Sequence, residues 1–142
     1  MYETTTGHSN VALGNYSLYG NTTGYYNVAL GYGAMTGANT GTYNVSIGIQ
    51  SGYANTSGYN NTYCGALAGY AVTEGHTNTL IGVNAGYGLI SGDNNICVGG
   101  NSGRAASPSG NLTTANNYVC IGDNSITPVS YTHLTLPTKR IV

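Results

Sequence analysis

Apolar and polar positions recur along the chain in one short pattern: a glycine, two variable residues, an asparagine, two further residues, an apolar residue and a closing glycine. Six copies follow one another at intervals of 17 residues, and a seventh ends at Gly122 after an interval of 23 residues. The surplus residues of the last interval fit a loop within 105–115, which is rich in Ser, Pro, Gly and Thr. The recurring asparagines are Asn10, Asn27, Asn44, Asn61, Asn78 and Asn95, and the closing glycines are Gly14, Gly31, Gly48, Gly65, Gly82 and Gly99. A unit this short cannot enclose a core alone, so the pattern indicates a tandem repeat that is stabilised by stacking.

Each copy contains one short apolar run rich in Val, Ile, Thr and Tyr, which predicts a short β-strand. Helix formers are scarce, so helical repeats are excluded. The pattern therefore predicts an all-β fold, a β-solenoid or β-roll of about seven coils with 17 residues per coil, in a single repeat region over residues 1–128. Parallel strands of neighbouring coils would lie about 4.8 Å apart, so the stack would rise roughly 34 Å.

Successive side chains alternate between the two faces of each predicted strand. We expect the outer two residues of each strand to fill the interior of the roll: Val11/Leu13, Val28/Leu30, Val45/Ile47, Thr62/Cys64, Thr79/Ile81, Ile96/Val98 and Val119/Ile121. The middle residue is then expected to point outward, and it is uncharged in every copy: Ala12, Ala29, Ser46, Tyr63, Leu80, Cys97 and Cys120. A second apolar face implies a second buried surface, which other copies of the same chain would supply.

The residues that frame each strand fit structural roles. The glycines suit tight corners with positive φ or close backbone approach. The asparagines suit hydrogen bonds to the local backbone or a ladder between coils, and we favour this role over ligand binding because repeat position alone explains it. After the strand, bulk changes places between neighbouring positions, as in Met35–Thr36 compared with Gly52–Tyr53. This exchange indicates a packed layer of constant volume.

Charge is scarce, because Asp, Glu, Lys and Arg make up 5% of the residues. The tail 129–142 holds two of the three basic residues and drops the repeat pattern. Within the tail, Val129 to Thr138 looks like a translated sequencing-library adapter, so we expect the tail to be non-native and disordered and the natural residues to end near Pro128. With Arg104 as the remaining base, no nucleic-acid partner is expected. Membrane insertion is not expected either, because no apolar run is long enough and no signal peptide is evident.

Candidate catalytic chemistry is confined to a few residues. His8 and His76 occupy the same repeat position but lie four coils apart, roughly 19 Å at the strand spacing, so they cannot share a proton or a metal. Glu74, His76 and Asp93 are expected to cluster at one corner, where they could hold a cation or form an acid/base pair. We favour a solvated corner instead. We therefore expect no enzymatic activity, no metal and no cofactor.

The three cysteines show no CxxC or Cys/His spacing that would indicate zinc. Cys97 and Cys120 take equivalent positions of successive coils if the insertion bulges outward, whereas Cys64 belongs to the opposite face. A disulfide between the first two is one alternative, but we favour buried free thiols that pack as small hydrophobic groups.

Aromatic residues offer a stronger binding hypothesis. Tyr53, Tyr70 and Tyr87 fall on three successive coils, and Arg104 follows them in the same column. An exposed aromatic ladder that ends in a cation would suit a sugar, because tyrosine offers an apolar face and a hydroxyl. The alternative, which we favour, is that this column packs between subunits. Corner tyrosines could extend a sugar platform: Tyr25, Tyr26, Tyr43 and Tyr59.

The segment NTTGYYNVALGYGAM, from Asn21 to Met35, resembles the 17-residue repeats of phage tail-fibre proteins and related bacterial surface proteins. In that group the repeats often precede an intramolecular chaperone domain of the endosialidase type, which trimerises the fibre and cleaves itself off. Asn-Val-Ala-Leu-Gly at 10–14 and 27–31 is more loosely similar to the head repeats of trimeric autotransporter adhesins. The resemblance covers Thr6 to about Thr127, and no catalytic residue of the chaperone domain maps onto this chain.

The resemblance implies a non-enzymatic structural segment of a homotrimeric phage tail fibre or tail-spike-like adhesin, located in the virion tail fibre. Such a segment would present or form a host attachment region whose partner is a cell-surface glycan or a protein receptor. The alternative is the head or stalk of a bacterial trimeric adhesin at the cell surface. An ice-binding solenoid is a further alternative, because solenoids display flat, regular arrays, although the Thr columns here are interrupted by Tyr, Asn and Gly.

Overall fold

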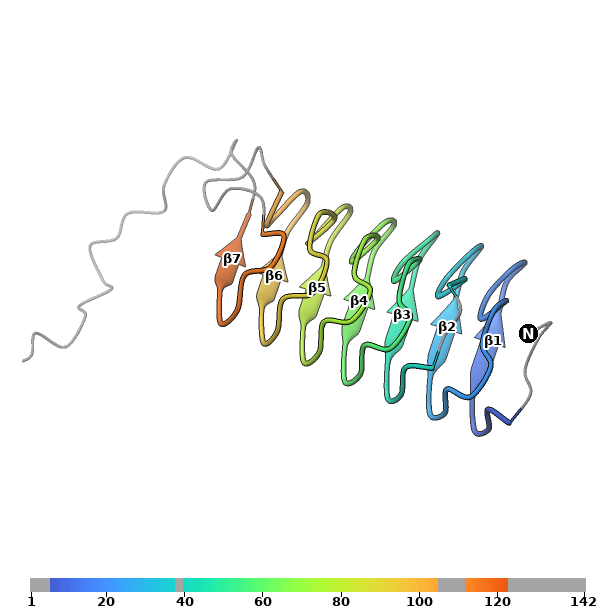
Figure 1. Ribbon diagram of the computed structural model, residues 1–142. Helices are drawn as coiled ribbons and strands as arrows, with labels where there is room; N and C mark the ends of the chain where they lie inside the picture. Colours follow the sequence, from blue (N-terminus) through green and yellow to red (C-terminus); the bar gives the residue numbers. More distant parts are fainter. Residues whose placement is uncertain (1–5, 38–39, 105–111, 123–142) are drawn as a thin grey trace, which may run out of the picture.

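The computed structural model describes residues 6–37, 40–104 and 112–122. Seven short strands form one parallel sheet in chain order (Figure 1). The strands are β1 (Val11–Leu13), β2 (Val28–Leu30), β3 (Val45–Ile47), β4 (Thr62–Cys64), β5 (Thr79–Ile81), β6 (Ile96–Val98) and β7 (Val119–Ile121). Among the described residues no helix occurs that could cross a membrane. This part of the chain is thus an all-β solenoid, as predicted.

Each coil contributes one strand, and we number the coils after their strands. From β1 to β6 equivalent residues pair directly, as Val11 does with Val28, and the chain makes about five turns. The register continues across the insertion, because Cys97 of β6 pairs with Cys120 of β7. The seven expected coils therefore correspond to seven strands, of which the first six keep the regular period. The insertion loop 105–111 and the tail 129–142 lie outside the described residues.

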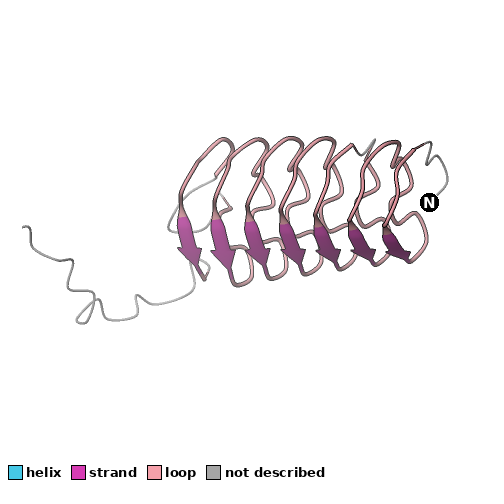
Figure 2. Ribbon diagram, turned by 90° about the horizontal axis from the view of Figure 1, so that it is seen from below, coloured by secondary structure: helices cyan, strands magenta, loops and turns pink. Residues whose placement is uncertain are grey.

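Strands form one wall of the solenoid, and turns form the rest of each coil (Figure 2). The chain leaves each strand through a closing glycine whose neighbour in the next coil lies very close. At Gly31, which has a φ of +136°, an added Cβ would lie 2.4 Å from the carbonyl oxygen of Gly48. No L side chain fits that space, which explains why glycine recurs at this position.

The middle residue of each strand lines the interior, so the expected orientation of the strands was wrong. Ala29, Tyr63 and Leu80 are fully buried, and the outer residue Leu13 is among the most exposed. The interior column is Ala12, Ala29, Ser46, Tyr63, Leu80, Cys97 and Cys120, of which Ala12 is half-buried and the others are buried. The aliphatic pairs that were expected inside point outward instead. The chain still has two apolar faces, with their roles exchanged.

The asparagine ladder explains this orientation. The side chain of Asn61 donates hydrogen bonds from Nδ2 to the Gly75 carbonyl oxygen (2.7 Å) and to Asn44 Oδ1 (3.1 Å). Its Oδ1 accepts a hydrogen bond from the backbone N–H of Asn78 at 2.9 Å. These bonds require Asn61 to face inward, and alternate residues of a strand share one face, so Tyr63 must also face inward. The residues beside Tyr63 are therefore directed outward whatever their hydrophobicity.

Core volume is balanced between the strand and the facing turn in coils 2 and 4. In coil 2 the small Ala29 packs in one buried cluster with the large Met35, six residues later. In coil 4 the large Tyr63 is matched by Gly69, where an added Cβ would lie 2.5 Å from Tyr63 Cδ1. The predicted exchange of bulk therefore exists, but it runs between opposite walls rather than between adjacent positions. A large residue on the strand requires glycine on the facing turn.

The buried apolar residues form two separate clusters. One contains Leu18, Ala29, Ala34 and Met35, and the other begins at Tyr63 and extends through the later coils. Between them, coil 3 places buried Ser46 and Ser51. The hydroxyls of Ser46 and Tyr63 are buried without a hydrogen-bond partner. Coil 3 is therefore a polar interruption in the core.

Candidate functional site

The outward face of the sheet is a regular surface of uncharged side chains that extends across all seven strands. Every strand residue on it is aliphatic, threonine or cysteine, and none is charged. We define the outward face as the outer two residues of each strand. Such exposed apolar patches mark interaction sites more often than ordinary surface.

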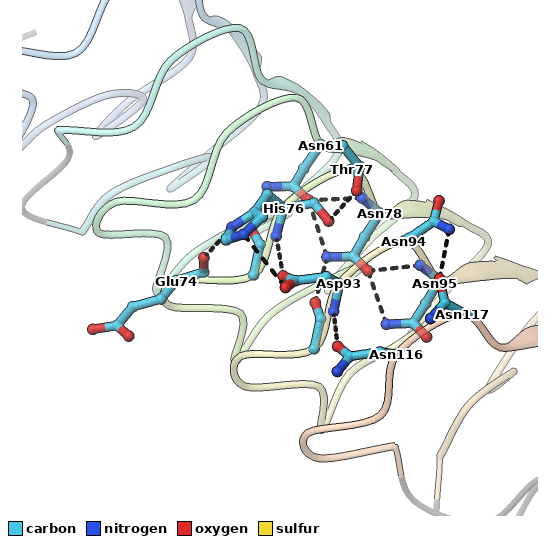
Figure 3. A network of polar contacts seen from close by, with 12 residues as sticks. Asn61, Glu74, His76, Thr77, Asn78, Asp93, Asn94, Asn95, Asn116 and Asn117 are labelled. Carbon is cyan, nitrogen blue, oxygen red and sulfur yellow. Dashed lines mark hydrogen bonds and ion pairs between the residues drawn. The ribbon is translucent and has the colours of Figure 1, made fainter.

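The corner that was expected to group Glu74, His76 and Asp93 brings only two of these side chains together (Figure 3). His76 Nε2 lies 3.3 Å from Asp93 Oδ2, and Asp93 Oδ1 accepts a hydrogen bond from the His76 backbone N–H at 2.9 Å. His76 Nδ1 contacts the main-chain oxygen of Glu74 at 2.9 Å, whereas the Glu74 carboxylate points away. No group of three metal-ligating side chains occurs among the described residues. The corner therefore holds a His–Asp pair rather than a cluster of all three side chains.

The His76–Asp93 pair has a structural role that its contacts define. Both side chains are partly exposed, so the ion pair contributes at most about 1 kcal/mol. The His76 ring also stacks on Tyr59, with centroids 4.4 Å apart and an interplanar angle of 9°. Asp93 is held in turn by the next coil, because its backbone N–H donates a hydrogen bond to Asn116 Oδ1. These contacts join coils 4 to 7 at a solvated corner.

Tyr53, Tyr70, Tyr87 and Arg104 do lie in one column. The rings of Tyr53 and Tyr70 are 5.0 Å apart at 7°, and those of Tyr70 and Tyr87 are 5.0 Å apart at 4°. The guanidinium carbon of Arg104 lies 4.9 Å from the centre of the Tyr87 ring. Both faces of Tyr70 and Tyr87 are thus occupied. A sugar therefore cannot stack on the face of either ring, and the two tyrosines offer a ligand only their ring edges and hydroxyls.

The corner tyrosines divide into two groups. Tyr59 packs with His76, as described above. Tyr26 and Tyr43 stack on each other at 5.1 Å and 28°, and both receive edge-to-face contacts from Tyr25. His8 lies parallel to Tyr25 at 5.1 Å. We call Tyr26 and Tyr43 the tyrosine pair; Tyr26 lies two residues before β2 and Tyr43 lies two residues before β3.

The cysteines divide as the spacing predicted. Cys97 and Cys120 are buried neighbours in the sheet, Cys64 is half-buried on the outward face, and all three are free thiols. Burial raises the pKa of Cys97 to about 12, and the neighbouring Cys120 adds to this effect. A thiol with such a pKa stays protonated at neutral pH and is a poor nucleophile.

No family model matches the chain, and no curated protein or solved structure is significantly similar to it. Two features were missed from the sequence: the outward face as the exposed apolar surface, and the tyrosine pair as a cluster distinct from Tyr59. The inward-facing asparagines carried the signal for the first, since they set the direction of every strand residue.

Proposed function

We propose that the chain is a structural segment of a homotrimeric phage tail fibre or tail-spike-like adhesin, which assembles through the outward face. The exposed apolar sheet face is the observation that carries this proposal. Each coil encloses its own core, so the aliphatic side chains that remain outside need a different partner. A second copy of the same chain presents a surface of matching length and period.

The outward face is a long, narrow patch. Seven parallel strands about 4.8 Å apart extend roughly 29 Å along the coil axis, and three residues across give about 10 Å. The resulting patch of about 290 Å² is close to the lower end of the range for the largest apolar patch on a typical monomer. Three copies arranged about a threefold axis parallel to the solenoid axis would bury all three outward faces against one another, which gives a closed assembly.

The proposal is tested by the sedimentation mass of the full chain, fused to a trimerising tag and measured again after the tag is removed. We expect the trimer to persist. Ile47→Lys, in the central part of the outward face, should give a monomer because it buries a charge in the contact. Ile90→Lys is the control, since Ile90 is similarly exposed (45% against 41% for Ile47) but lies outside the strands. A monomeric parent chain, or equal effects of both substitutions, would contradict the proposal.

The segment would give the fibre length and present or form its host attachment region, in contact with a cell-surface glycan or a protein receptor. We propose no catalytic role for it. A head or stalk segment of a bacterial trimeric adhesin would use the same face, and the two assignments differ in the domains joined to the repeat.

An ice-binding solenoid is a second candidate, and one observation favours it. Thr62 and Thr79 lie on the outward face among β-branched neighbours at the regular coil spacing. Thermal hysteresis shown by a monomeric chain would support this function, whereas a stable trimer would cover the face and exclude it.

A further inference from the structure

The tyrosine pair has a backbone conformation that does not suit its side chains. Tyr26 and Tyr43 have φ values of 55° and 58°, in the left-handed region. The equivalent positions of the other described coils have the same conformation but carry small or polar residues: Ser9, Asn60, Thr77, Asn94 and Asn117. Asparagine tolerates this region, whereas a bulky aromatic residue is unfavourable there. Coils 2 and 3 thus carry tyrosine where asparagine would suit the backbone better. Leu18 and Met35 share this conformation in the core, so the argument for a binding role depends on the exposure and stacking of the pair.

The pair is exposed and held in place by its neighbours. Tyr26 is 51% exposed and Tyr43 is 52% exposed. The Tyr25 ring meets both at angles near perpendicular, with centroids 5.5 Å from Tyr26 and 5.7 Å from Tyr43. His8 contacts Tyr26 edge-on at 5.9 Å. The two rings are therefore preorganised, so a ligand would not have to order them on binding.

Among the described residues, Tyr43 differs from Tyr70 and Tyr87 in having a stacked partner on one side only, an arrangement that Tyr53 shares. Tyr70 is covered by a parallel ring on each side. Tyr43 has one such neighbour among the described residues, Tyr26, and on the side of coil 4 the next residue of its column is the exposed Asn60. An aromatic face beside an amide group can stack on a pyranose ring and hydrogen-bond to its hydroxyls.

The charge distribution limits the ligand to a neutral one. The described Asp, Glu, Lys and Arg residues are Glu74, Asp93 and Arg104, and all three follow β4 in the chain. The described parts of coils 1 to 3 therefore offer no permanent charge to a sialic acid, a uronic acid or a phosphate. We propose that Tyr43, backed by Tyr26 and flanked by Asn60, binds a pyranose ring of a neutral glycan. The inference rests on the attachment role proposed above and not on the trimer.

Native gels that contain dextran, mannan or galactan test this site with the full chain, and hyaluronan serves as an anionic comparison. We expect at least one neutral polymer to retard the protein, with no retardation by hyaluronan. Tyr43→Asn should weaken the binding at least tenfold and Tyr26→Asn at least threefold. Neither variant should lower the melting temperature, because asparagine suits the backbone. Tyr32→Asn is the matched control: Tyr32 is 51% exposed, lies outside the pair, and its loss should change binding less than twofold.

Three results would overturn the site. These are no retardation by any neutral polymer, an equal loss of binding in Tyr32→Asn, or stronger retardation by hyaluronan. Sedimentation of the same variants separates this proposal from the trimer. If Tyr43→Asn converts a trimer into a monomer, the pair belongs to the subunit contact and the glycan site is refuted. A monomeric parent chain that binds a neutral glycan would refute the trimer and support the site.

Discussion

The volume balance between opposite walls makes a prediction for Tyr63 and Gly69. Coil 2 has Ala29 and Met35 at the same two positions, so the double substitution Tyr63→Ala with Gly69→Met gives coil 4 the arrangement of coil 2. Tyr63→Ala alone should cost about 3–5 kcal/mol through the cavity that it leaves. Gly69→Met alone should cost about 2–5 kcal/mol. Of this, roughly 1–2 comes from the positive φ and about 1–3 from overpacking against the ring.

In the double variant the new methionine occupies the space left by the ring. We therefore expect its total cost to fall short of the sum of the single costs by about 2–3 kcal/mol, near the upper end of measured couplings. Urea unfolding followed by far-UV circular dichroism provides the three free energies. If a single variant is unfolded in water, recovery of structure in the double variant reports the same coupling.

Gly86→Met is the control partner, because an added Cβ at Gly86 meets Leu80 rather than Tyr63. Combined with Tyr63→Ala, it should show no rescue. Additive costs within about 0.5 kcal/mol for Tyr63 and Gly69 would refute the reasoning. Glycine would then be required at this position only for its backbone conformation.

Three further predictions concern the ladder, the buried phenol and the thiols. Asn61→Ala should cost about 3 kcal/mol or more in urea unfolding, because it leaves buried backbone groups unpaired, and Asn10→Ala at the end of the ladder should cost less than half of that. Tyr63→Phe should stabilise the protein by about 1 kcal/mol at pH 7, since it removes an unpaired hydroxyl. Burial raises the pKa of Tyr63 above its ordinary value of 10.0, so its contribution to stability is present below about pH 10 and is lost as the pH rises further; the alkaline unfolding midpoint should therefore move upward in Tyr63→Phe. Iodoacetamide at pH 8 should modify Cys64 in the monomeric variant Ile47→Lys but Cys97 only after unfolding, as peptide mass spectrometry would show.

The positions and register of all seven strands followed from the sequence, because regularly spaced glycines leave one way to align the coils. The direction of the side chains did not follow. Aliphatic residues such as Leu13 suggested an interior, but the hydrogen bonds of the asparagines decide which face points inward. The free-energy cost of leaving buried amide groups without hydrogen-bond partners exceeds the free energy gained by burying a few methyl groups.

The candidate sites show a similar limit. Spacing placed Tyr53, Tyr70 and Tyr87 in one column, but the sugar hypothesis needed open ring faces. Rings in neighbouring coils lie one strand spacing apart, which is stacking distance, so they cover each other. Spacing also brought Glu74 near His76, yet only its main-chain oxygen reaches the ring. Side-chain direction at a turn depends on local φ and ψ, which the repeat pattern does not specify.

Uniform pairing between equivalent residues of successive coils has a genetic consequence. Recombination between two repeats of the gene deletes or duplicates whole 17-residue units, and each surviving coil then meets a neighbour with the same backbone register. Only the side chains at the new junction have to adapt. This matters chiefly where a coil with a large strand residue, such as Tyr63, meets a coil with a large turn residue, such as Met35. The length of the solenoid can therefore change in a single mutational event, by about 4.8 Å per repeat unit, while its outward face stays continuous.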